Sequence, residues 1–371
     1  MNNHQILEEL FARGAIDLRR GAIFDVLPAA RQCVDWDRIE GLILGLAIGD
    51  SLGNHSESMT PRERRARHGE IRDYLATAHA NGERVGVPSD DTQLAAWTLE
   101  QLVADGQYVP AHVAEMFRSG RIHGIGQTVR EFLGRMAGGV PWYEAGPQSA
   151  GNGALMRVAP ILIPHLRTPT PALWIDSALV AMTTHNDNAS IASCIAFTAI
   201  FWDLIAIDSA PAPEWWLDRF SEVSRDLATN RMYRTRDRYF PEYEGPFLDF
   251  VRAEVTRARA SGLSALDACN RTGSGAYLME TVPSVLSILE RHARDPEEAI
   301  IRAVNDTWDN DSIAAIVGAA VGALHGARAL PARWKAGLLG RTRDHDDGRL
   351  FAILDEARQA FGGANVEPTA E

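Results

Sequence analysis

Apolar residues recur at intervals of three and four along most of the chain, which is the spacing of one face of an α-helix. Clusters of Gly, Pro, Asp and Asn separate these segments, as expected at helix ends. Alternating patterns typical of β-strands are scarce. The sequence therefore predicts an all-α, orthogonal multi-helix fold with too many helices for a four-helix bundle. The predicted helices are Ile6–Arg13, Asp37–Asp50, Thr92–Asp105, Pro110–Ser119, Thr128–Met136, Ala172–Thr183, Ala189–Ile205, Tyr277–Arg291, Pro296–Asn305, Ser312–Arg328 and Leu350–Phe361.

The pattern also divides the chain into three parts. Residues 1–36 contain only short apolar runs and are interpreted as an N-terminal extension, residues 37–362 as the main domain, and residues 363–371 as a flexible tail. The extension either packs on its own domain or fits a groove on a partner protein. Both alternatives depend on the apolar side chains Ile6, Leu7, Leu10, Phe11, Ile23, Phe24, Val26 and Leu27.

The helix predicted over Ser312–Arg328 carries glycines at every fourth position, Gly318, Gly322 and Gly326. In a soluble chain such a row of small residues lets a second helix approach closely, as it does in membranes. This helix is therefore predicted to be central and buried, and its N-terminus becomes the end of interest.

Composition limits the classes of function. The chain has 371 residues, 46% of them hydrophobic, which is enough for one large domain or two ordinary ones. A net charge of -12 argues against binding nucleic-acid backbones by electrostatics alone. Cys33, Cys194 and Cys269 fit neither a disulfide framework nor a zinc pattern, which favours a reducing cytoplasm. The N-terminus is not a secretory signal, and the longest apolar stretch, Ile313–Leu324, is too short to span a bilayer, so membrane insertion is excluded.

Two predicted helices begin with clusters of oxygen-bearing side chains. One cluster is Ser89-Asp90-Asp91-Thr92, and the other is Asp309-Asn310-Asp311-Ser312. Helix capping explains one oxygen in each, because Asp and Ser are favoured at N-caps. It leaves the further acids unexplained, since unpaired buried carboxylates repel one another. A divalent cation such as Mg²⁺ or Mn²⁺, which prefers hard oxygen ligands, resolves this conflict.

A calcium-binding loop does not fit the second cluster. Counted from Asp309, the sixth position is Ala314 where such a loop has Gly, and the twelfth is Ala320 where it has Glu. If the two clusters meet in space, they can hold two metal ions a few ångströms apart, an arrangement suited to vicinal hydroxyls and an oriented water.

Two further segments could contact a ligand. Gly151-Asn152-Gly153 is either an ordinary tight turn or a place where backbone N–H groups approach a diphosphate. His185 is either a core histidine, a cap partner or a ligand contact. The run Asp344–Asp347 lacks partner histidines at helical spacing and is interpreted as a solvated loop, which counts against a dinuclear phosphohydrolase.

Taken in order, these motifs resemble those of the ADP-ribosylglycohydrolase family, the relatives of dinitrogenase-reductase-activating glycohydrolase. The resemblance runs from about Gly41 to Trp334. The matching segments are Gly41–Gly53 followed by Glu57, Ser89–Thr92, Gly151–Arg157, Thr184–Asp187, Asp309–Gly318, and Pro331 with Trp334.

The resemblance implies an orthogonal all-α fold with a dinuclear Mg²⁺ or Mn²⁺ centre. In the family, the metals engage ribose hydroxyls of ADP-ribose while a water attacks the anomeric carbon, with Glu57 as the gating or acid/base residue. The implied metal ligands are Ser89, Asp90, Asp91, Asp309, Asp311 and Ser312, with Glu57, Asp90 and Asp311 in catalytic roles. The implied substrate contacts are Gly151, Asn152, Gly153, Met156, His185 and Tyr277.

Two departures leave the acceptor of ADP-ribose open. Arginine-directed relatives carry an acid in the segment His123–Thr128, which has none here, and Ala150 stands where some relatives have an aromatic residue. The expected partner is an ADP-ribosylated protein or nucleic acid. Some relatives that protect bacteria against ADP-ribosylating toxins dock an N-terminal extension into the toxin, so an immunity role is a further hypothesis. The alternative to a hydrolase is a binding protein that occludes such a toxin without turnover.

Overall fold

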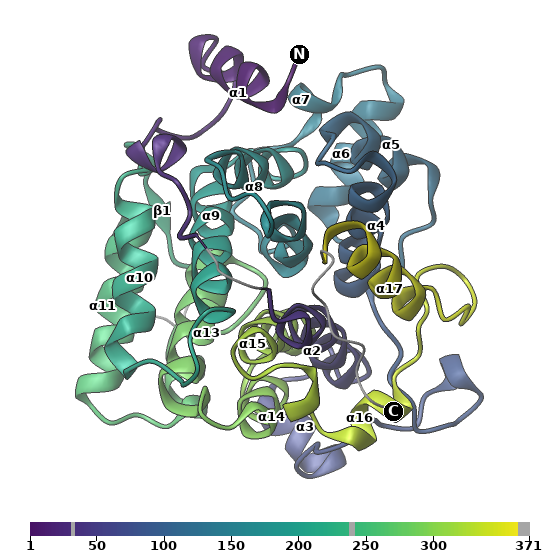
Figure 1. Ribbon diagram of the computed structural model, residues 1–371. Helices are drawn as coiled ribbons and strands as arrows, with labels where there is room; N and C mark the ends of the chain where they lie inside the picture. The colour runs from purple at the N-terminus through teal and green to yellow at the C-terminus, as the bar shows by residue number, and fades with distance from the viewer. Residues whose placement is uncertain (31–33, 237–241, 363–371) are drawn as a thin grey trace.

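The computed structural model describes residues 1–30, 34–236 and 242–362, and nearly every regular element in these ranges is a helix (Figure 1). The predicted all-α class is confirmed. The predicted tail, residues 363–371, and Cys33 lie outside the described residues. The α-helices are α1 (Asn3–Ala12), α2 (Trp36–Asn54), α3 (Pro61–His68), α4 (Asp90–Asp105), α5 (Pro110–Ser119), α6 (Gln127–Ala137), α7 (Trp142–Ala145), α8 (Ala172–Met182), α9 (Asn188–Leu204), α10 (Pro213–Arg225), α11 (Phe247–Ala260), α12 (Ala265–Thr272), α13 (Leu278–His292), α14 (Pro296–Asp306), α15 (Asn310–His325), α16 (Ala332–Gly337) and α17 (Arg349–Phe361). The 3-10 helices are η1 (Ala22–Asp25), η2 (Ala78–Ala80), η3 (Leu155–Arg157), η4 (Ala159–His165) and η5 (Ala327–Ala329).

The strands in the described part of the chain form one short antiparallel pair. β1 (Tyr233–Arg234) lies against β2 (Glu244–Gly245), with Tyr233 opposite Gly245. The Tyr233 hydroxyl donates a hydrogen bond of 2.8 Å to the carboxylate of Asp187, which anchors the pair to the start of α9. No helix among the residues described is long and apolar enough to cross a membrane.

Helices α2 and α15 lie antiparallel to each other at the centre of the molecule, with their backbones in contact (Figure 1). A Cβ atom added at Gly45 would overlap the carbonyl oxygen of Gly318, and one added at Gly49 would overlap that of Ala314. Every residue of α15 except His325 is buried. The predictions that this helix is central and that a second helix approaches it closely are confirmed.

The ends of these two helices differ from the prediction. α15 stops at His325 rather than Arg328, because Gly326 has a φ of +83°, a left-handed conformation that ends helices and that glycine adopts without strain. α2 continues one turn beyond the predicted end at Asp50, as far as Asn54. This additional turn is packed against the start of α15, and it reaches the functional site.

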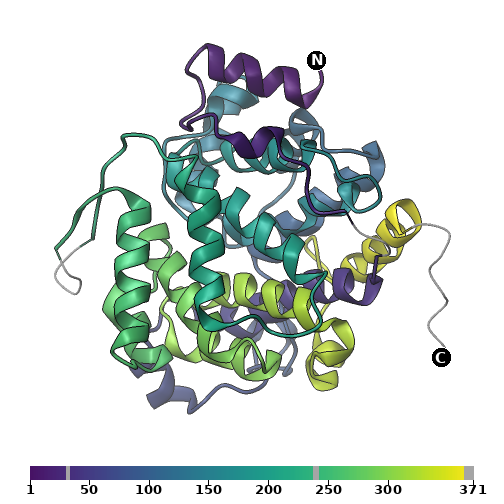
Figure 2. The same ribbon diagram turned by 60° about the vertical axis from the view of Figure 1, so that its left-hand side comes forward.

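The remaining helices surround the central pair (Figures 1 and 2). In Figure 1, α10, α11 and α13 lie on the left, and α4, α5, α6 and α17 lie on the right. The helices α3, α14 and α16 are below the pair, and α1, α7 and α8 are above it. The segments at the start of α4 and of α15 both contact the end of α2.

Among the α-helices of eight or more residues, α3, α10, α11 and α12 are absent from the predicted set. The sequence of α3, PRERRARH, has almost no apolar side chain, and its burial rests on Arg64, which is 0% exposed. A capping box between Thr60 and Glu63 starts this helix. The other three helices are amphipathic and carry start signals, Pro213 at the first turn of α10 and Ser264 as the N-cap of α12, so the sequence contains information for them.

Residues 1–30 pack on the main domain. Leu7, Leu10 and Phe24 are buried in its hydrophobic core, whereas Val26 and Leu27 are exposed at 52% and 67%. Hydrogen bonds from α8 and from the loop before α9 join the segment at several points along its length. Of the two alternatives for the extension, packing on its own domain accounts for most of its apolar side chains.

The close contact of α2 and α15 predicts unequal effects of the same substitution. Gly45→Ala is expected to destabilise the protein by more than about 2 kcal/mol, because the new methyl group forces the two backbones apart. Gly134→Ala is the matched control, since Gly134 lies inside α6 and its added Cβ meets no atom within 4 Å. That change is expected to be neutral or to stabilise by up to about 1 kcal/mol. Chemical unfolding of both variants measures the difference, and similar free energies of unfolding would contradict this account of the contact.

Candidate functional site

The N-terminus of α4 carries more carboxylates than its cap uses. Ser89 is the N-cap, and its Oγ accepts a hydrogen bond of 3.3 Å from the backbone N–H of Asp91. The carboxylates of Asp90 and Asp91 do not contribute to the cap. Asp91 is 2% exposed, and its Oδ2 is a buried atom without a hydrogen-bond partner. Capping therefore explains the serine and leaves the two acids for another role.

Asp50, near the C-terminal end of α2, holds the first turn of α4 through hydrogen bonds. Its carboxylate accepts hydrogen bonds from Ser89 N at 3.0 Å, Thr92 N at 3.1 Å and Thr92 Oγ1 at 2.5 Å. Thr92 is thus bound to Asp50 and orients the cluster. Asp50 has no role among the predicted site residues, although it belongs to the Gly41–Gly53 motif. An acid in an otherwise apolar helix is the signal that identifies it.

The start of α15 is brought to the same place by the final turn of α2. A Cβ atom on Gly53 would lie 2.5 Å from Asp311 Cα, so the two backbones touch there. Asp309 occupies the N-cap position, but its side chain makes no capping hydrogen bond. Its Oδ2 instead accepts a hydrogen bond of 2.6 Å from Asn152 Nδ2. One turn of α2 therefore contacts both oxygen clusters, which lie about 220 residues apart in the sequence.

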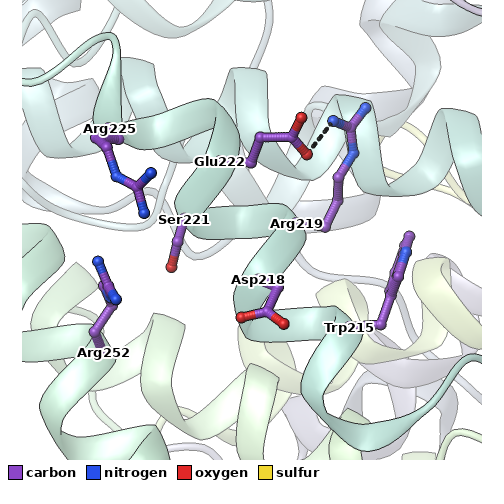
Figure 3. Close-up of a pocket in the computed structure, with 7 residues that line it drawn as sticks. All are labelled: Trp215, Asp218, Arg219, Ser221, Glu222, Arg225 and Arg252. Carbon is purple, nitrogen blue, oxygen red and sulfur yellow. Dashed lines mark hydrogen bonds and ion pairs between the residues drawn. The ribbon is translucent and has the colours of Figure 1, made fainter.

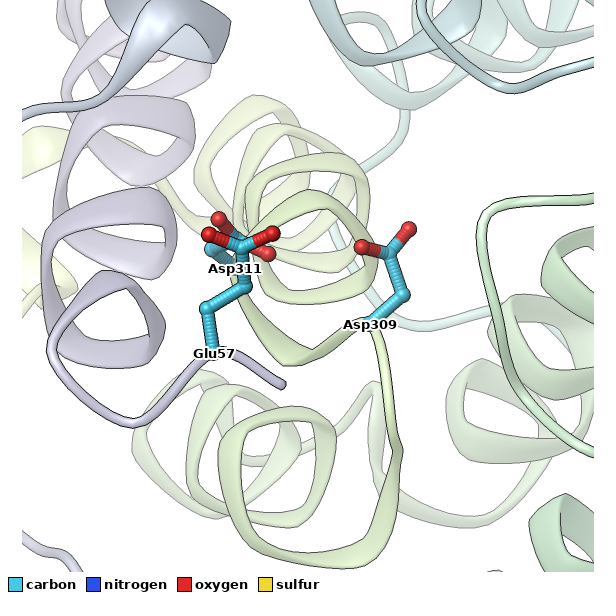
Figure 4. A group of neighbouring side chains, drawn as sticks. All are labelled: Glu57, Asp309 and Asp311. Carbon is cyan, nitrogen blue, oxygen red and sulfur yellow. The ribbon is translucent and has the colours of Figure 1, made fainter. Parts of the chain in front are cut away.

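Three carboxylates converge at this point (Figure 4). Ligand oxygens of Glu57, Asp309 and Asp311 all lie within 4.8 Å of one another. Glu57 comes from the turn after α2, and the two aspartates come from the start of α15 (Figure 4). Glu57, predicted as a gating or acid/base residue, thus lies among atoms spaced for metal binding. Asp90 and Asp91 are not part of this close group.

The charges of the two clusters nevertheless influence one another. Burial, together with the neighbouring Asp50 carboxylate, raises the pKa of Asp90 to about 7. Burial also raises the pKa of Asp91 well above its usual value, and the Asp311 carboxylate adds to this shift. The pKa of Asp311 is raised by burial and by Asp309 in the same way.

The cluster therefore satisfies the chemical conditions for divalent cations. It combines buried carboxylates that repel one another, serine hydroxyls, and the unpartnered Oδ2 of Asp91. Hard oxygen donors of this kind suit Mg²⁺ or Mn²⁺, and a cation would offset the repulsion. Ser312 belongs to this set through its place at the start of α15, where it is 6% exposed.

Arg64 holds the loops on either side of the cluster together. Its guanidinium donates to Ser56 Oγ at 3.0 Å and to Met59 O at 2.9 Å, both in the turn that carries Glu57. It also donates to Thr307 O at 2.7 Å, shortly before Asp309. The sequence gives no signal for this role, because arginine in a strongly charged helix is usually solvated.

The predicted substrate segment Gly151–Gly153 lies next to the acidic cluster. Asn152 binds Asp309 as described, and its backbone N–H donates to Ala276 O at 2.9 Å. Gly151 forms an isolated antiparallel bridge with Tyr277. Met156 follows on η3, and its Sδ lies 3.9 Å from Ser312 Oγ. These four predicted residues are thus brought together with the start of α15.

His185 explains why the turn contains glycine. A Cβ atom on Gly153 would lie 3.0 Å from Cε1 of the imidazole, and one on Gly151 would lie 3.4 Å from Nε2. The ring therefore packs directly on the faces of both glycines. Burial lowers the pKa of His185 to about 3, so the imidazole is neutral at pH 7. The glycines accommodate this ring, and a contact of the turn with a diphosphate stays a prediction.

Tyr277 is 9% exposed, and the guanidinium of Arg236 lies over its ring at 4.5 Å from the centroid. Stacking of adenine on this ring stays a prediction. Glu280, one turn later, accepts a hydrogen bond of 3.1 Å from Gly275 N, and burial raises its pKa to about 7. This buried acid beside Tyr277 is absent from the predicted site residues.

Comparison with known proteins identifies the family. The sequence model of ADP-ribosylglycohydrolase matches residues 31–363. The chain belongs to the ADP-ribosylglycohydrolase family.

Relatives of this family share about a quarter of their residues with the chain. The ADP-ribosylarginine hydrolase Tri1 of Pseudomonas putida is 27% identical over 80% of this chain and 73% of its own length. The ADP-ribosyl-[dinitrogen reductase] glycohydrolase of Rhodospirillum rubrum is 27% identical over 80% of this chain and 89% of its own. A solved ADP-ribosylglycohydrolase-related protein complex aligns with a TM-score of 0.59 and 24% identity, covering 88% of this chain and 98% of that one, which shows the shared fold.

The pocket shown in Figure 3 lies along α10 and α11, and no residue of the ADP-ribosylglycohydrolase motifs lines it. Its volume is about 330 Å³, and Arg219 and Glu222 at its edge form an ion pair of 2.9 Å. None of the predicted site residues lines it. The run Asp344–Asp347 is exposed, as predicted for a solvated loop.

The role of Asp50 can be tested by Asp50→Asn. The amide exchanges one acceptor oxygen for a donor facing the N–H groups of Ser89 and Thr92, so the first turn of α4 should shift. We expect Mg²⁺ affinity, measured by calorimetry, to fall by about 10- to 100-fold. Asp187→Asn is the control, because that buried carboxylate also accepts from a backbone N–H and a hydroxyl, at the start of α9. Equal Mg²⁺ affinities in both variants would contradict a role for Asp50 at the cluster.

The raised pKa values predict how stability depends on pH. Asp90 and Asp309, whose folded pKa values are about 7 and about 6, hold protons in the folded chain at pH values where the unfolded chain has released them. The metal-free protein should therefore lose stability as the pH rises from about 5 to about 8.

Mg²⁺ should reverse this loss, with an increase in Tm of about 5 °C at 100 times its Kd and a smaller effect at low pH. Thermal unfolding with Mg²⁺ or with EDTA checks both trends. A Mg²⁺-dependent increase as large at pH 5 as at pH 8 would show that these carboxylates do not bind the ion.

Proposed function

We propose that this protein hydrolyses the glycosidic bond that joins ADP-ribose to a modified target. Family membership and the hydrolase names of its relatives support an ADP-ribosyl hydrolase activity. The observation that carries the proposal is the convergence of Glu57, Asp309 and Asp311 with the acids of α4 at the end of α2. The proposal also covers which cations bind and which acceptor carries the ADP-ribose.

The proposed cofactor is a pair of Mg²⁺ ions, or Mn²⁺ in their place. One side of the centre would be formed by Ser89, Asp90 and Asp91, and the other by Asp309, Asp311 and Ser312. Bound divalent cations chelate vicinal hydroxyls and lower the pKa of water, which supplies a nucleophile near neutral pH. Support comes from the donor set itself, which is hard, crowded and negatively charged.

The carboxylates also suit the charge that develops in the reaction. Cleavage of a glycosidic bond gives the anomeric carbon an oxocarbenium-like positive charge, which nearby anions such as Asp90 and Asp311 stabilise. Glu57 is an exposed residue, and partial desolvation of its carboxyl group together with the neighbouring Asp50 carboxylate raises its pKa. A carboxyl group with a raised pKa and access to solvent can accept a proton from water or give one to the leaving group.

The proposed substrate contacts are the turn Gly151–Gly153 with Met156, His185 and Tyr277. The position of these residues supports this assignment, because Asn152 of the turn binds Asp309 and the turn therefore lies directly beside the acids. A ligand bound here would place its diphosphate near the turn and its ribose near the carboxylates.

The acceptor carrying ADP-ribose is proposed to be a protein or a nucleic acid. The relatives' names specify arginine and dinitrogen reductase. The segment His123–Thr128, which lacks the acid of arginine-directed relatives, lies against the site, because a Cβ atom on Gly124 would be 3.1 Å from Asp90 Oδ1. This position supports the proposal that the segment contacts the acceptor, and its lack of an acid leaves acceptors other than arginine open.

An immunity role remains a hypothesis, and the N-terminal segment gives it limited support. Docking of residues 1–36 into a toxin would need apolar side chains free for a partner, and within residues 1–30 only Val26 and Leu27 of the predicted set are exposed. The division of the chain at residues 36 and 37 is proposed as a sequence boundary only.

Turnover distinguishes a hydrolase from a protein that binds ADP-ribose or a toxin without cleavage. ADP-ribose release is measured from peptides ADP-ribosylated on arginine or serine and from ADP-ribosylated nucleic acid, with Mg²⁺, with Mn²⁺ and with EDTA. We expect release from at least one substrate and its loss in EDTA. Bound metal without release from any substrate would favour the binding protein.

Asp90→Asn and Asp311→Asn are each expected to lower kcat/KM by at least about 100-fold. Their metal-free Tm should be equal to or higher than that of the wild type, because each change removes a buried repulsive charge. Asp176→Asn is the control, since Asp176 is a buried carboxylate bound to His165 outside the cluster. It should keep activity whatever its effect on Tm, and a similar loss of activity in all three variants would contradict the assignment.

A further inference from the structure

Arg157 is a buried cation that has no carboxylate partner among the described residues. It is 0% exposed, and its guanidinium lies over the ring of Phe117 at 5.0 Å from the centroid. Its Nε donates a hydrogen bond of 3.1 Å to Gly153 O, in the proposed substrate turn. Its Nη2 donates to Val180 O at 3.3 Å and to Thr184 Oγ1 at 2.7 Å. Burial of an unpaired charge costs free energy, so we ask what the hydrogen bonds of Arg157 contribute in return.

The contact with Thr184 determines the direction of the next hydrogen bond. Arginine has no acceptor atoms, so Thr184 Oγ1 must accept from Arg157. The same oxygen lies 2.9 Å from Nδ1 of His185. Thr184 is 0% exposed, and its hydroxyl has no other hydrogen-bond acceptor in the described residues. The hydroxyl hydrogen is therefore donated to Nδ1, since otherwise it would be buried without a partner.

This arrangement leaves the hydrogen of the neutral ring on Nε2. Within the described residues Nε2 has no hydrogen-bond partner, and it is not among the fully enclosed unpaired atoms. It faces the turn of Gly151 and Gly153, where added Cβ atoms would lie 3.4 Å and 3.1 Å from it. The ring therefore presents one free donor beside the turn.

We propose that Arg157 and Thr184 are positioning residues that hold His185 as the Nε2–H tautomer, whose free N–H donates to a phosphate oxygen of bound ADP-ribose. The identity of the ligand rests on the proposed function, whereas the tautomer rests on the contacts alone. A neutral donor of fixed direction suits this place, because the orientation of the ring is set by buried groups before the ligand binds.

The test compares two neighbouring threonines. Thr184→Val removes the hydroxyl that donates to His185 at nearly constant volume. Thr183→Val is the matched control, because Thr183 is also buried and its Oγ1 donates to Leu179 O at 2.7 Å, away from the imidazole. Thr184→Ser restores the hydroxyl, and Thr184→Ala serves as the second variant if the valine variant does not fold.

Two measurements are made on each variant. Nitrogen-15 NMR of labelled histidines, with His185→Gln to assign the signal, reports which ring nitrogen carries the hydrogen. Calorimetry with ADP-ribose and Mg²⁺ gives Kd. We expect hydrogen on Nε2 in the wild type and in Thr184→Ser. In Thr184→Val we expect a mixture of tautomers and a Kd, and a KM, about tenfold higher, with kcat within about threefold.

Hydrogen on Nδ1 in the wild type would overturn the proposal, as would a Thr184→Val variant that matches Thr183→Val in tautomer and Kd. A wild type that neither binds ADP-ribose nor releases it from any substrate would instead contradict the proposed function. In that case the NMR comparison still decides whether Thr184 controls the ring.

Discussion

The backbone contact between α2 and α15 is the constraint on which the site depends. Because Gly45 and Gly49 bring the two helices to within contact of their carbonyl groups, the next turn of α2 reaches the first turn of α15 at Gly53 and Asp311. Asp50, on that same turn, holds the start of α4 through Ser89 and Thr92. A larger separation of the helices would move the two acidic clusters apart, even if every carboxylate kept its place in the sequence. Small side chains in the core and the position of the buried acids are thus parts of one arrangement.

The buried acidic cluster lowers the free energy of unfolding of the metal-free chain. Burial and mutual repulsion raise the pKa values of Asp90, Asp91 and Asp311, so the folded chain resists carrying all of these charges at once. The surrounding structure maintains the arrangement because the large apolar core and the α2–α15 contact supply the compensating free energy. In return, the acids are already assembled, so the cations of the proposed function would bind with little reorganisation.

The sequence was sufficient for those features that depend on local pattern. Helical periodicity predicted most helices, the glycine row predicted the close helix contact, and surplus acids at Ser89–Thr92 and Asp309–Ser312 predicted their proximity. The sequence was insufficient where a residue type that is usually exposed is buried instead. Arg64 and Asp50 are charged groups inside the protein, and nothing in their neighbours along the chain shows which distant carbonyls or amides they bind. The turn at Gly151–Gly153 lies beside the acids through Asn152, but the ring of His185 that its glycines accommodate could be found only from the fold.

Two buried arginines stand on either side of the acids without forming an ion pair to any of them. Arg64 donates to backbone carbonyls and Ser56. Burial lowers the pKa of Arg64 to about 10, although Asp311 and Asp306 favour its charged form. Arg157 donates to two carbonyls and a hydroxyl, and Asp90 contributes to the stability of its charge. A direct salt bridge would occupy the carboxylate oxygens that the proposed cations would use. Positive charge held at a distance lowers the repulsion among the acids and keeps those oxygens available. The same guanidinium groups hold the loops beside the acids by donating hydrogen bonds to carbonyl oxygens of those loops. The two arginines therefore both position the acids and partly offset their negative charge.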